Sequence, residues 1–281
     1  MVENRPFFTV LTHIVMILGL AIVLFPIYIA FVASTHEARD VLSTVQGWFG
    51  GNLIDNYTTI LKSGKATTGG IPVGHMMWNS FIMALGIVVG KISISIISAY
   101  AIVYFRFRFR MFFFWIIFMT LMLPVEVRIL PTYHVVASLG LLNTYTGLTL
   151  PLIASATATF LFRQFFLTVP DELTEAARVD GAGPIRFFFD VLLPLSRTNI
   201  AALCVILFIY GWNQYLWPLL ITTEKDMTTI VMGIQAMLYV PDDINEWNKT
   251  MATAILAMLP PVVVILALQR QFVKGLIETE K

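Results

Sequence analysis

Apolar residues occur along this chain in six long runs, each with few charged side chains. A helix that crosses about 30 Å of hydrocarbon at roughly 1.5 Å per residue needs about 20 such residues, which is close to the length of these runs. Because water is absent there, each run is predicted to be helical, and a barrel of alternating strands is excluded. The predicted spans are roughly Phe7–Ala33, Phe81–Tyr104, Phe112–Leu130, Leu148–Phe166, Ile200–Ile221 and Met251–Leu268.

The predicted fold class is therefore all-α, a polytopic membrane protein with six transmembrane helices. The first run is longer than the apolar core of a secretory signal and no A-x-A site follows it, so we expect it to be retained. An even number of spans places both termini on one side. Of the basic residues outside the spans, eleven lie on the side of the termini and five lie on the other side. Since basic loops favour the cytoplasm, both termini are predicted to be cytoplasmic and the segments 34–80 and 222–250 to face outward.

Composition supports a membrane protein and removes several other classes. Hydrophobic residues make up 58% and charged residues 12% of the chain, against roughly 45–50% and 25% in soluble domains. The net charge of +1 gives no surplus of basic residues for binding nucleic acid. The single cysteine, Cys204, cannot form an internal disulfide.

Catalytic and metal-binding patterns are weak in this sequence. The four histidines lack metal-ligand spacing, and no nucleophile occupies a recognisable catalytic turn. The nearest approach to a phosphate-binding loop, Gly86–Lys91, is one residue too short and lies inside a predicted span. The sequence therefore predicts neither an intramembrane enzyme nor ATP hydrolysis by this chain.

The largest predicted cytoplasmic segment, Arg163–Asn199, has its own helix signals. Pro170-Asp171-Glu172 gives a helix with an acidic first turn, Gly181 ends it, and Gly183-Pro184 begins a second short helix. Pro194 is predicted to prevent continuation into the next span. The segment is thus predicted to be helix, turn and helix.

The spacing of charged and small residues gives the first of these helices two different surfaces. Asp171, Glu175 and Arg178 form a charged stripe, while Leu173 and a pair of alanines give a narrow surface that another backbone can approach closely. This pattern predicts a docking loop. An amphipathic loop lying along the bilayer is the alternative.

The string Glu175–Ala182, followed by Pro184 and closed by Leu192-Leu193-Pro194, resembles the EAA loop of ABC importer permeases. In that family the loop is a coupling helix that sits in a cleft of the ATP-hydrolysing subunit. The resemblance implies that Glu175 pairs with a basic residue there and that Gly181 permits the sharp turn. The coupling residues that it implies are Glu175, Ala176, Ala177, Arg178, Asp180, Gly181 and Pro194.

Other stretches resemble the carbohydrate-uptake branch of these permeases, which includes the maltose permease. They are Asn79-Ser80, Leu123-Pro124 with Pro131, and Trp212-Asn213-Gln214. Within that branch, Leu121–Arg128 and Ala154–Phe160 are most similar to permeases of sn-glycerol-3-phosphate importers.

The resemblance implies the type I ABC importer permease fold and a division of the chain into three parts. Residues 1–74 would hold the first helix and a periplasmic loop, residues 75–270 the core domain with the EAA loop at about 170–194, and residues 271–281 a cytoplasmic tail. Within residues 34–80, a glycine-rich segment, a short amphipathic helix is predicted near Leu53–Leu61.

The function implied is inward transport of sn-glycerol 3-phosphate or a glycerophosphodiester across the bacterial inner membrane by alternating access. The implied partners are a homologous permease subunit, two ATP-binding subunits, a periplasmic substrate-binding protein and the lipid bilayer, with no nucleic acid. No cofactor would be bound by this chain, because ATP and Mg are used by the partner ATPase. Two alternatives are a permease for another sugar or polyol and an ion-coupled secondary transporter.

Three charged residues fall inside the predicted spans, where each costs about 2.5–3.5 kcal/mol at mid-bilayer. They are Lys91, Glu126 and Arg128. Our hypothesis is that Arg128, with Lys91, lines the translocation path and attracts the cargo's phosphate, because guanidinium binds phosphate oxygens bidentately. The alternative is that Glu126 pairs with Lys91 or Arg128 and locks the bundle; in a secondary transporter, Glu126 or Lys91 would relay protons. Asn213 and Gln214 are further candidates for the path, with a helix-packing hydrogen bond as the alternative for Asn213.

Overall fold

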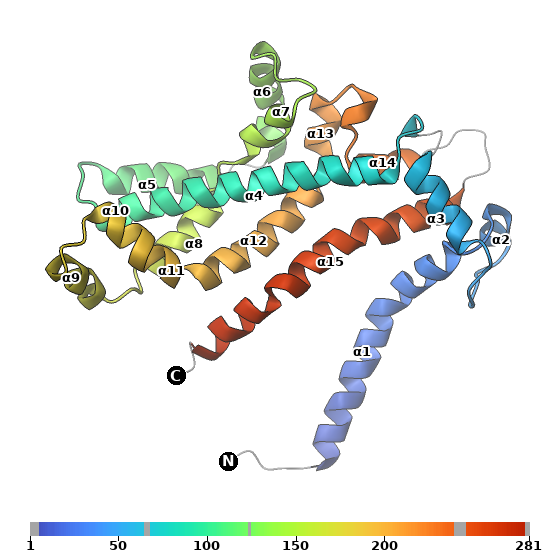
Figure 1. Cartoon of the computed structure of the whole chain (residues 1–281), viewed down its shortest axis with the longest axis horizontal. Coiled ribbons are helices and arrows are strands. Elements are labelled where there is room, and N and C mark those ends of the chain that lie inside the picture. The colour runs from blue at the N-terminus through green and yellow to red at the C-terminus, as the bar shows by residue number, and fades with distance from the viewer. Residues whose placement is uncertain (1–5, 65–67, 123–124, 239–245, 279–281) are drawn as a thin grey trace. The chain divides into compact units, whose positions relative to one another are not determined.

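The chain is helical in every regular element that the structure describes (Figure 1). This computed structural model describes residues 6–64, 68–122, 125–238 and 246–278, and the side chains at 6, 121, 125, 126 and 272–278 lie outside the described set. The predicted all-α class is confirmed. Two compact units make up the chain, Met1–His75 with Gly233–Leu259, and Met76–Met232 with Pro260–Lys281.

The first unit contains α1 (Pro6–Ala33), α2 (Ala38–Ser43) and α3 (Leu53–Lys62), together with the first part of α15 (Trp247–Glu278) and part of α14 (Ile230–Leu238). The helix α3 confirms the short helix predicted near Leu53–Leu61. It buries Asn56 beside Ile60, so polar groups as well as apolar ones hold this helix in place.

Asn56 is the centre of a buried hydrogen-bond network in the first unit. Its Nδ2 donates to the carbonyls of Ser34 and His36, at 2.9 and 2.8 Å. Asn248, near the start of α15, donates to His36 O and to Asn56 Oδ1, each at 3.0 Å. Since buried polar groups are costly unless paired, this network fixes the end of α1 against α3 and α15.

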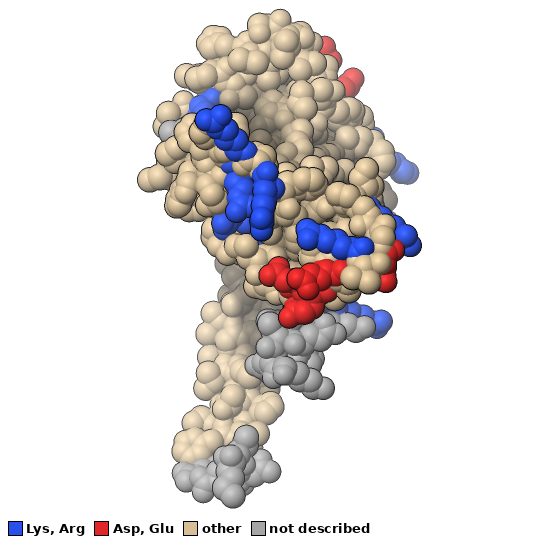
Figure 2. Space-filling view, turned by 90° about the vertical axis from the view of Figure 1, so that its left-hand side faces the viewer, with Lys and Arg blue, Asp and Glu red and all other residues tan. Residues whose placement is uncertain are grey.

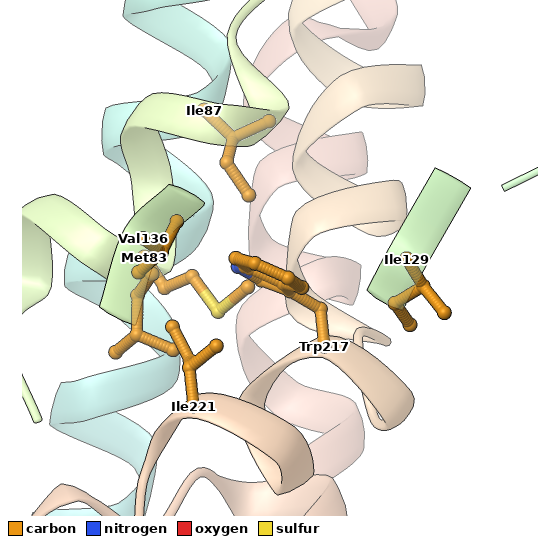
Figure 3. Close-up of a cluster of buried hydrophobic side chains, with 7 residues drawn as sticks. Met83, Ile87, Ile129, Val136, Trp217 and Ile221 are labelled. Atoms are coloured by element: carbon orange, nitrogen blue, oxygen red, sulfur yellow. The ribbon is translucent and has the colours of Figure 1, made fainter. Parts of the chain in front are cut away.

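The second unit is built around α4 (Val73–Tyr104) and includes α6 (Val125–Ser138), α7 (Tyr145–Thr149), α12 (Arg197–Trp212) and α13 (Leu216–Ile221). Figure 3 shows the indole of Trp217 among side chains from α4, α6 and α13. Its Nε1 donates to Gly147 O at 3.2 Å. The cluster consists of Met83, Ile87, Ile129, Val136, Leu148, Trp217 and Ile221.

Glycines let neighbouring segments approach α4 closely. A Cβ at Gly86 would lie 2.8 Å from Thr149 Cγ2, and one at Gly90 would overlap Ile153 Cγ2. Small residues four apart on one helix face are a common device for packing helices in membranes. The stretch that came nearest to a phosphate-binding loop is therefore a packing surface of α4.

Three of the described helices are long and apolar enough to cross a membrane unbroken, at Phe7–Ala33, Val73–Tyr104 and Trp247–Gln271. They correspond to the first, second and sixth predicted runs. The third, fourth and fifth runs are not single helices, so that part of the prediction is wrong. The count of six spans and the cytoplasmic placing of both termini stay predictions.

The breaks in these runs have local causes. In the fourth run, α7 and the turn Leu150–Leu152 join α8 (Ala156–Phe166) at a bend of 49°. Pro151 has no amide proton to continue α7, and the Ser155 hydroxyl accepts from Ala158 N, which begins a new helix. In the third run, α5 (Arg110–Met119) gives way to a 3₁₀ turn before α6 begins.

The fifth run divides at residues 213–215. The helix α12 ends at Trp212 and α13 begins at Leu216. Tyr215, the residue before α13, has φ of −120° and ψ of −58°, which departs from helical geometry. The break falls at the polar pair Asn213-Gln214, but the apolar residues on either side dominate the hydropathy of the run, so it was predicted as one helix.

Candidate functional site

The predicted helix, turn and helix of the Arg163–Asn199 segment is present as α9 (Asp171–Val179) and α10 (Pro184–Phe187). We call residues 171–187 the elbow. Asp171 and Glu172 lie in the first turn of α9, where negative charge is favoured. The second helix begins at a proline, as predicted.

A glycine in the left-handed region makes the turn of the elbow. Gly181 has φ of +72°, its amide donates to Arg178 O at 3.0 Å, and the Ala182 amide donates to Ala177 O at 2.8 Å. This pair of bonds is the Schellman arrangement that satisfies the last carbonyls of a helix. A residue with a Cβ is strained at this φ, so the turn depends on Gly181.

Pro194 does not end the segment where the sequence predicted. It lies inside α11 (Leu193–Leu195), which follows a π-helical turn at Phe188–Leu192. The bend of 69° falls between Pro184–Leu195 and α12, so it falls at Ser196. The Ser196 hydroxyl donates to Leu192 O at 2.6 Å. A proline in the first turn of a helix is tolerated because its missing N–H has no intrahelical partner there.

The elbow exposes its charged residues and part of its alanine surface. Glu175, Ala176 and Asp180 are exposed, whereas Ala177 is buried. The predicted small-residue surface is thus divided between the two sides of α9. Figure 2 shows acidic side chains gathered on the face of the molecule that α9 occupies in Figure 1.

Two apolar side chains beside the turn were not singled out from the sequence. Val179 and Ile185 are 87% and 76% exposed. The sequence feature that could have identified them is their position on either side of a glycine turn. Exposed apolar side chains next to charged ones are typical of a surface that contacts another protein.

The buried side of the elbow rests on the last turns of α4. Tyr100 Oη donates to Pro184 O at 2.9 Å, and the ring of Tyr104 lies 5.3 Å from the ring of the buried Phe187. A cavity of about 170 Å³ lies between these elements, lined in part by Ala177 and Arg178. Sequence reasoning did not identify either tyrosine.

Lys91 and Arg128 lie near one another in the second unit. Lys91, on α4, is only 8% exposed, and its Nζ lies 4.0 Å from the centroid of the Tyr210 ring on α12. An aromatic face stabilises a cation in this position. Arg128, on α6, is exposed, and its charge acts on both Lys91 and Tyr210. The structure therefore brings together two of the three charged residues that were predicted in the spans.

The third charged residue, Glu126, has a side chain outside the described residues, so its pairing with Lys91 or Arg128 stays a prediction. Among the side chains that are described, no carboxylate lies within ion-pair distance of either cation. Gln214 Nε2 donates to Tyr210 O at 3.1 Å. Asn213 is exposed at the end of α12.

Comparison with known proteins identifies the family. Residues 91–278 match the family described as the binding-protein-dependent transport system inner membrane component. The chain belongs to this family. It is a transport permease subunit of the inner membrane, as the sequence predicted.

Curated relatives match the permease along its whole length. The sn-glycerol-3-phosphate transport system permease protein UgpE of Agrobacterium fabrum is 58% identical over all of both chains. The proteins of the same name from Brucella melitensis and Escherichia coli O1:K1 are 57% and 55% identical, again over all of both chains.

A solved structure supports the fold. The permease superimposes with a TM-score of 0.78 on a chain of a bacterial ABC transporter involved in the import of the acidic polysaccharide alginate, with 96% of this chain and 98% of that chain covered. The two are 20% identical. The type I importer permease fold predicted from the sequence is confirmed.

Proposed function

We propose that this permease forms half of the membrane channel of an ATP-driven importer and moves sn-glycerol 3-phosphate inward by alternating access. The identity of 55% to 58% with full-length permeases named for that solute supports the cargo. A permease for another sugar or polyol of the same branch is the alternative.

Charge supports a phosphate-bearing cargo. Lys91 and Arg128 together carry two positive charges, and a phosphate monoester carries about −1.5 to −2 at pH 7. Arg128 is exposed and can bind phosphate oxygens through two N–H groups at once. Lys91 is held against the Tyr210 ring, which places a second cation close by without a described carboxylate to neutralise it.

The cargo site is tested by substitution of each cation. In proteoliposomes that contain the complete importer, Arg128→Gln and Lys91→Gln should lower binding-protein-dependent uptake by roughly 10- to 100-fold, the range for one charged hydrogen bond. Arg106→Gln, a substitution at an exposed arginine between α4 and α5, is the matched control. Normal uptake by an Arg128→Gln complex that assembles normally would contradict the proposal.

Substitution of Glu126 distinguishes a cargo-binding role of Lys91 and Arg128 from a purely structural one. If Glu126 locks the bundle by pairing with a cation, Glu126→Gln should lower the yield and the melting temperature of the assembled complex. Under the cargo proposal, Glu126→Gln leaves assembly intact. The two hypotheses are therefore distinguished by a measurement of stability made beside the uptake assay.

We further propose that the elbow docks in a separate ATP-hydrolysing subunit, with Glu175 paired to a basic residue there. The exposure of Glu175 and the adjacent Ala176 supports this role. ATP binding would close the two ATP-hydrolysing subunits, draw the elbows together and open the two permeases outward. The complete importer would contain a homologous permease, two ATP-hydrolysing subunits and a substrate-binding protein, and ATP and Mg would be bound outside this chain.

Charge reversal on α9 tests the docking. Glu175→Lys should leave the permease in the membrane but prevent co-purification of the ATPase and abolish uptake. Glu172→Lys makes the same charge change at an exposed position on the same helix and should retain both. A Glu175→Lys permease that co-purifies and transports at the normal rate would refute docking, and uptake that survives ATP depletion would favour a secondary transporter.

A further inference from the structure

The segment that follows α2 folds back along the end of α1. Tyr28 Oη donates to Gly47 O at 2.7 Å. The ring of Phe49 lies 6.2 Å from the ring of Tyr28 and 5.6 Å from that of Phe31, both on α1. Residues 44–52, which we call the return loop, therefore lie beside the last two turns of α1 (Figure 1).

Hydrogen bonds fix the far end of the return loop as well. The amide of Gly50 donates to Thr35 Oγ1 at 2.7 Å, and the amide of Asn52 donates to Thr35 O at 2.9 Å. A Cβ at Gly50 would lie 2.5 Å from the same carbonyl oxygen. The folded-back path is thus held by α1 at Gly47 and Phe49 and by Thr35, just after α1, at Gly50 and Asn52.

The position along α1 sets the depth of the return loop. The span Phe7–Ala33 has its midpoint at Leu20, so at 1.5 Å per residue Tyr28 lies about 12 Å and Phe31 about 17 Å from the bilayer centre. The hydrocarbon extends about 15 Å from that centre. A tilted helix would bring both residues closer to it. The return loop therefore lies at the boundary between acyl chains and headgroups.

The return loop exposes large apolar side chains and no charged one. Trp48 and Val45 are each 83% exposed, and no charged residue occurs between Asp40 and Asp55. Tryptophan is enriched at this boundary, because its ring is apolar and its N–H can reach water. The return loop also lies beside α1, whose apolar window is not buried by the residues that the structure describes.

We propose that the return loop inserts into the leaflet at the C-terminal end of α1, with Trp48 and Val45 in contact with lipid. The loop then anchors that end of α1 in the bilayer. This surface differs from the cargo site and the elbow, and the proposal requires only that α1 spans the membrane. A substrate-binding protein or the homologous permease is a competing occupant, and each gives a different result in the experiment below.

Spin labelling of the complete importer in proteoliposomes tests the insertion. A Cys204→Ala background removes the native cysteine, and Trp48→Cys or Val45→Cys then carries the label. Accessibility to oxygen, which concentrates in lipid, is compared with accessibility to a water-soluble nickel chelate. Val23→Cys on the exposed side of α1 is the lipid control, and Thr58→Cys on α3 is the water control.

Labels at positions 48 and 45 should be several-fold more accessible to oxygen than to the chelate, as at position 23. Accessibility to the chelate equal to that at position 58 would overturn the proposal. Protection that appears only when the substrate-binding protein is added would also overturn it, since the surface would then be a protein-docking site. Exclusion of both reagents at both positions would instead indicate burial against the homologous permease.

Discussion

Tyr100 connects α4 to the elbow, and its hydroxyl can be removed without changing the packing around it. The substitution Tyr100→Phe removes the 2.9 Å hydrogen bond to Pro184 O but keeps the ring contacts with Phe105 and Phe188, at 5.3 and 5.0 Å. A neutral hydrogen bond contributes about 1 kcal/mol net. Its loss should change the ratio of attached to detached elbow by roughly fivefold.

Hydrogen exchange of the assembled importer measures this change. Amides in residues 171–187 should exchange roughly fivefold faster in Tyr100→Phe, and less cargo should be transported per ATP hydrolysed. Tyr104→Phe is the matched control, because Tyr104 Oη lies 3.5 Å from Phe166 O, at the limit of a hydrogen bond. Wild-type exchange in Tyr100→Phe, or an equal increase in both variants, would refute the argument.

Three further substitutions test the packing and the loops. Gly90→Leu should lower the free energy of unfolding by about 1–3 kcal/mol, because the added side chain meets Ile153. Gly74→Ala adds a Cβ that meets no atom within 4 Å, so it should not lower this free energy. Thermal denaturation of the two variants would show the difference. Asn143→Ala removes the acceptor for two backbone amides of the 222–229 loop and should make that loop more sensitive to protease, whereas unchanged cleavage would contradict the role. Burial raises the pKa of Tyr57 above 10.0, although its hydrogen bond with a serine opposes the shift. The folded state therefore holds the proton more tightly, and stability should fall as the pH rises above about 10. Tyr57→Phe should show a smaller fall in melting temperature over that range, and an identical fall would refute the assignment.

The apolar runs correctly predicted those helices that are unbroken. Length and hydropathy were sufficient for α1 and for the spans within α4 and α15, since a long apolar segment in lipid has no alternative to an intact helix. They failed at Leu148–Phe166, where Pro151 and Ser155 divide the run. Hydropathy is averaged over a whole run, so it does not reveal a bend caused by one or two residues. Such a bend is seen only in the local hydrogen bonding.

The elbow could be predicted because its rules are local. Gly181 and Pro184 lie close together in the chain, and each restricts the backbone at its own position. Tyr100 could not be predicted, because it lies 84 residues from Pro184 and the contact depends on how the helices pack. The same applies to Lys91 and Tyr210, whose pairing requires α4 and α12 to be neighbours.

The helix α4 gives a direct mechanical link between the elbow and Lys91. Lys91 and Tyr100 lie on it nine residues apart, about 14 Å along its axis, and no proline interrupts it. The route from the elbow into α12 instead passes through a π-helical turn and a bend of 69° at Ser196, where movement can be absorbed. We therefore expect elbow motion to reach Lys91 through α4. On this argument Tyr100→Phe lowers transport per ATP without changing the KM for cargo, whereas Lys91→Gln raises that KM.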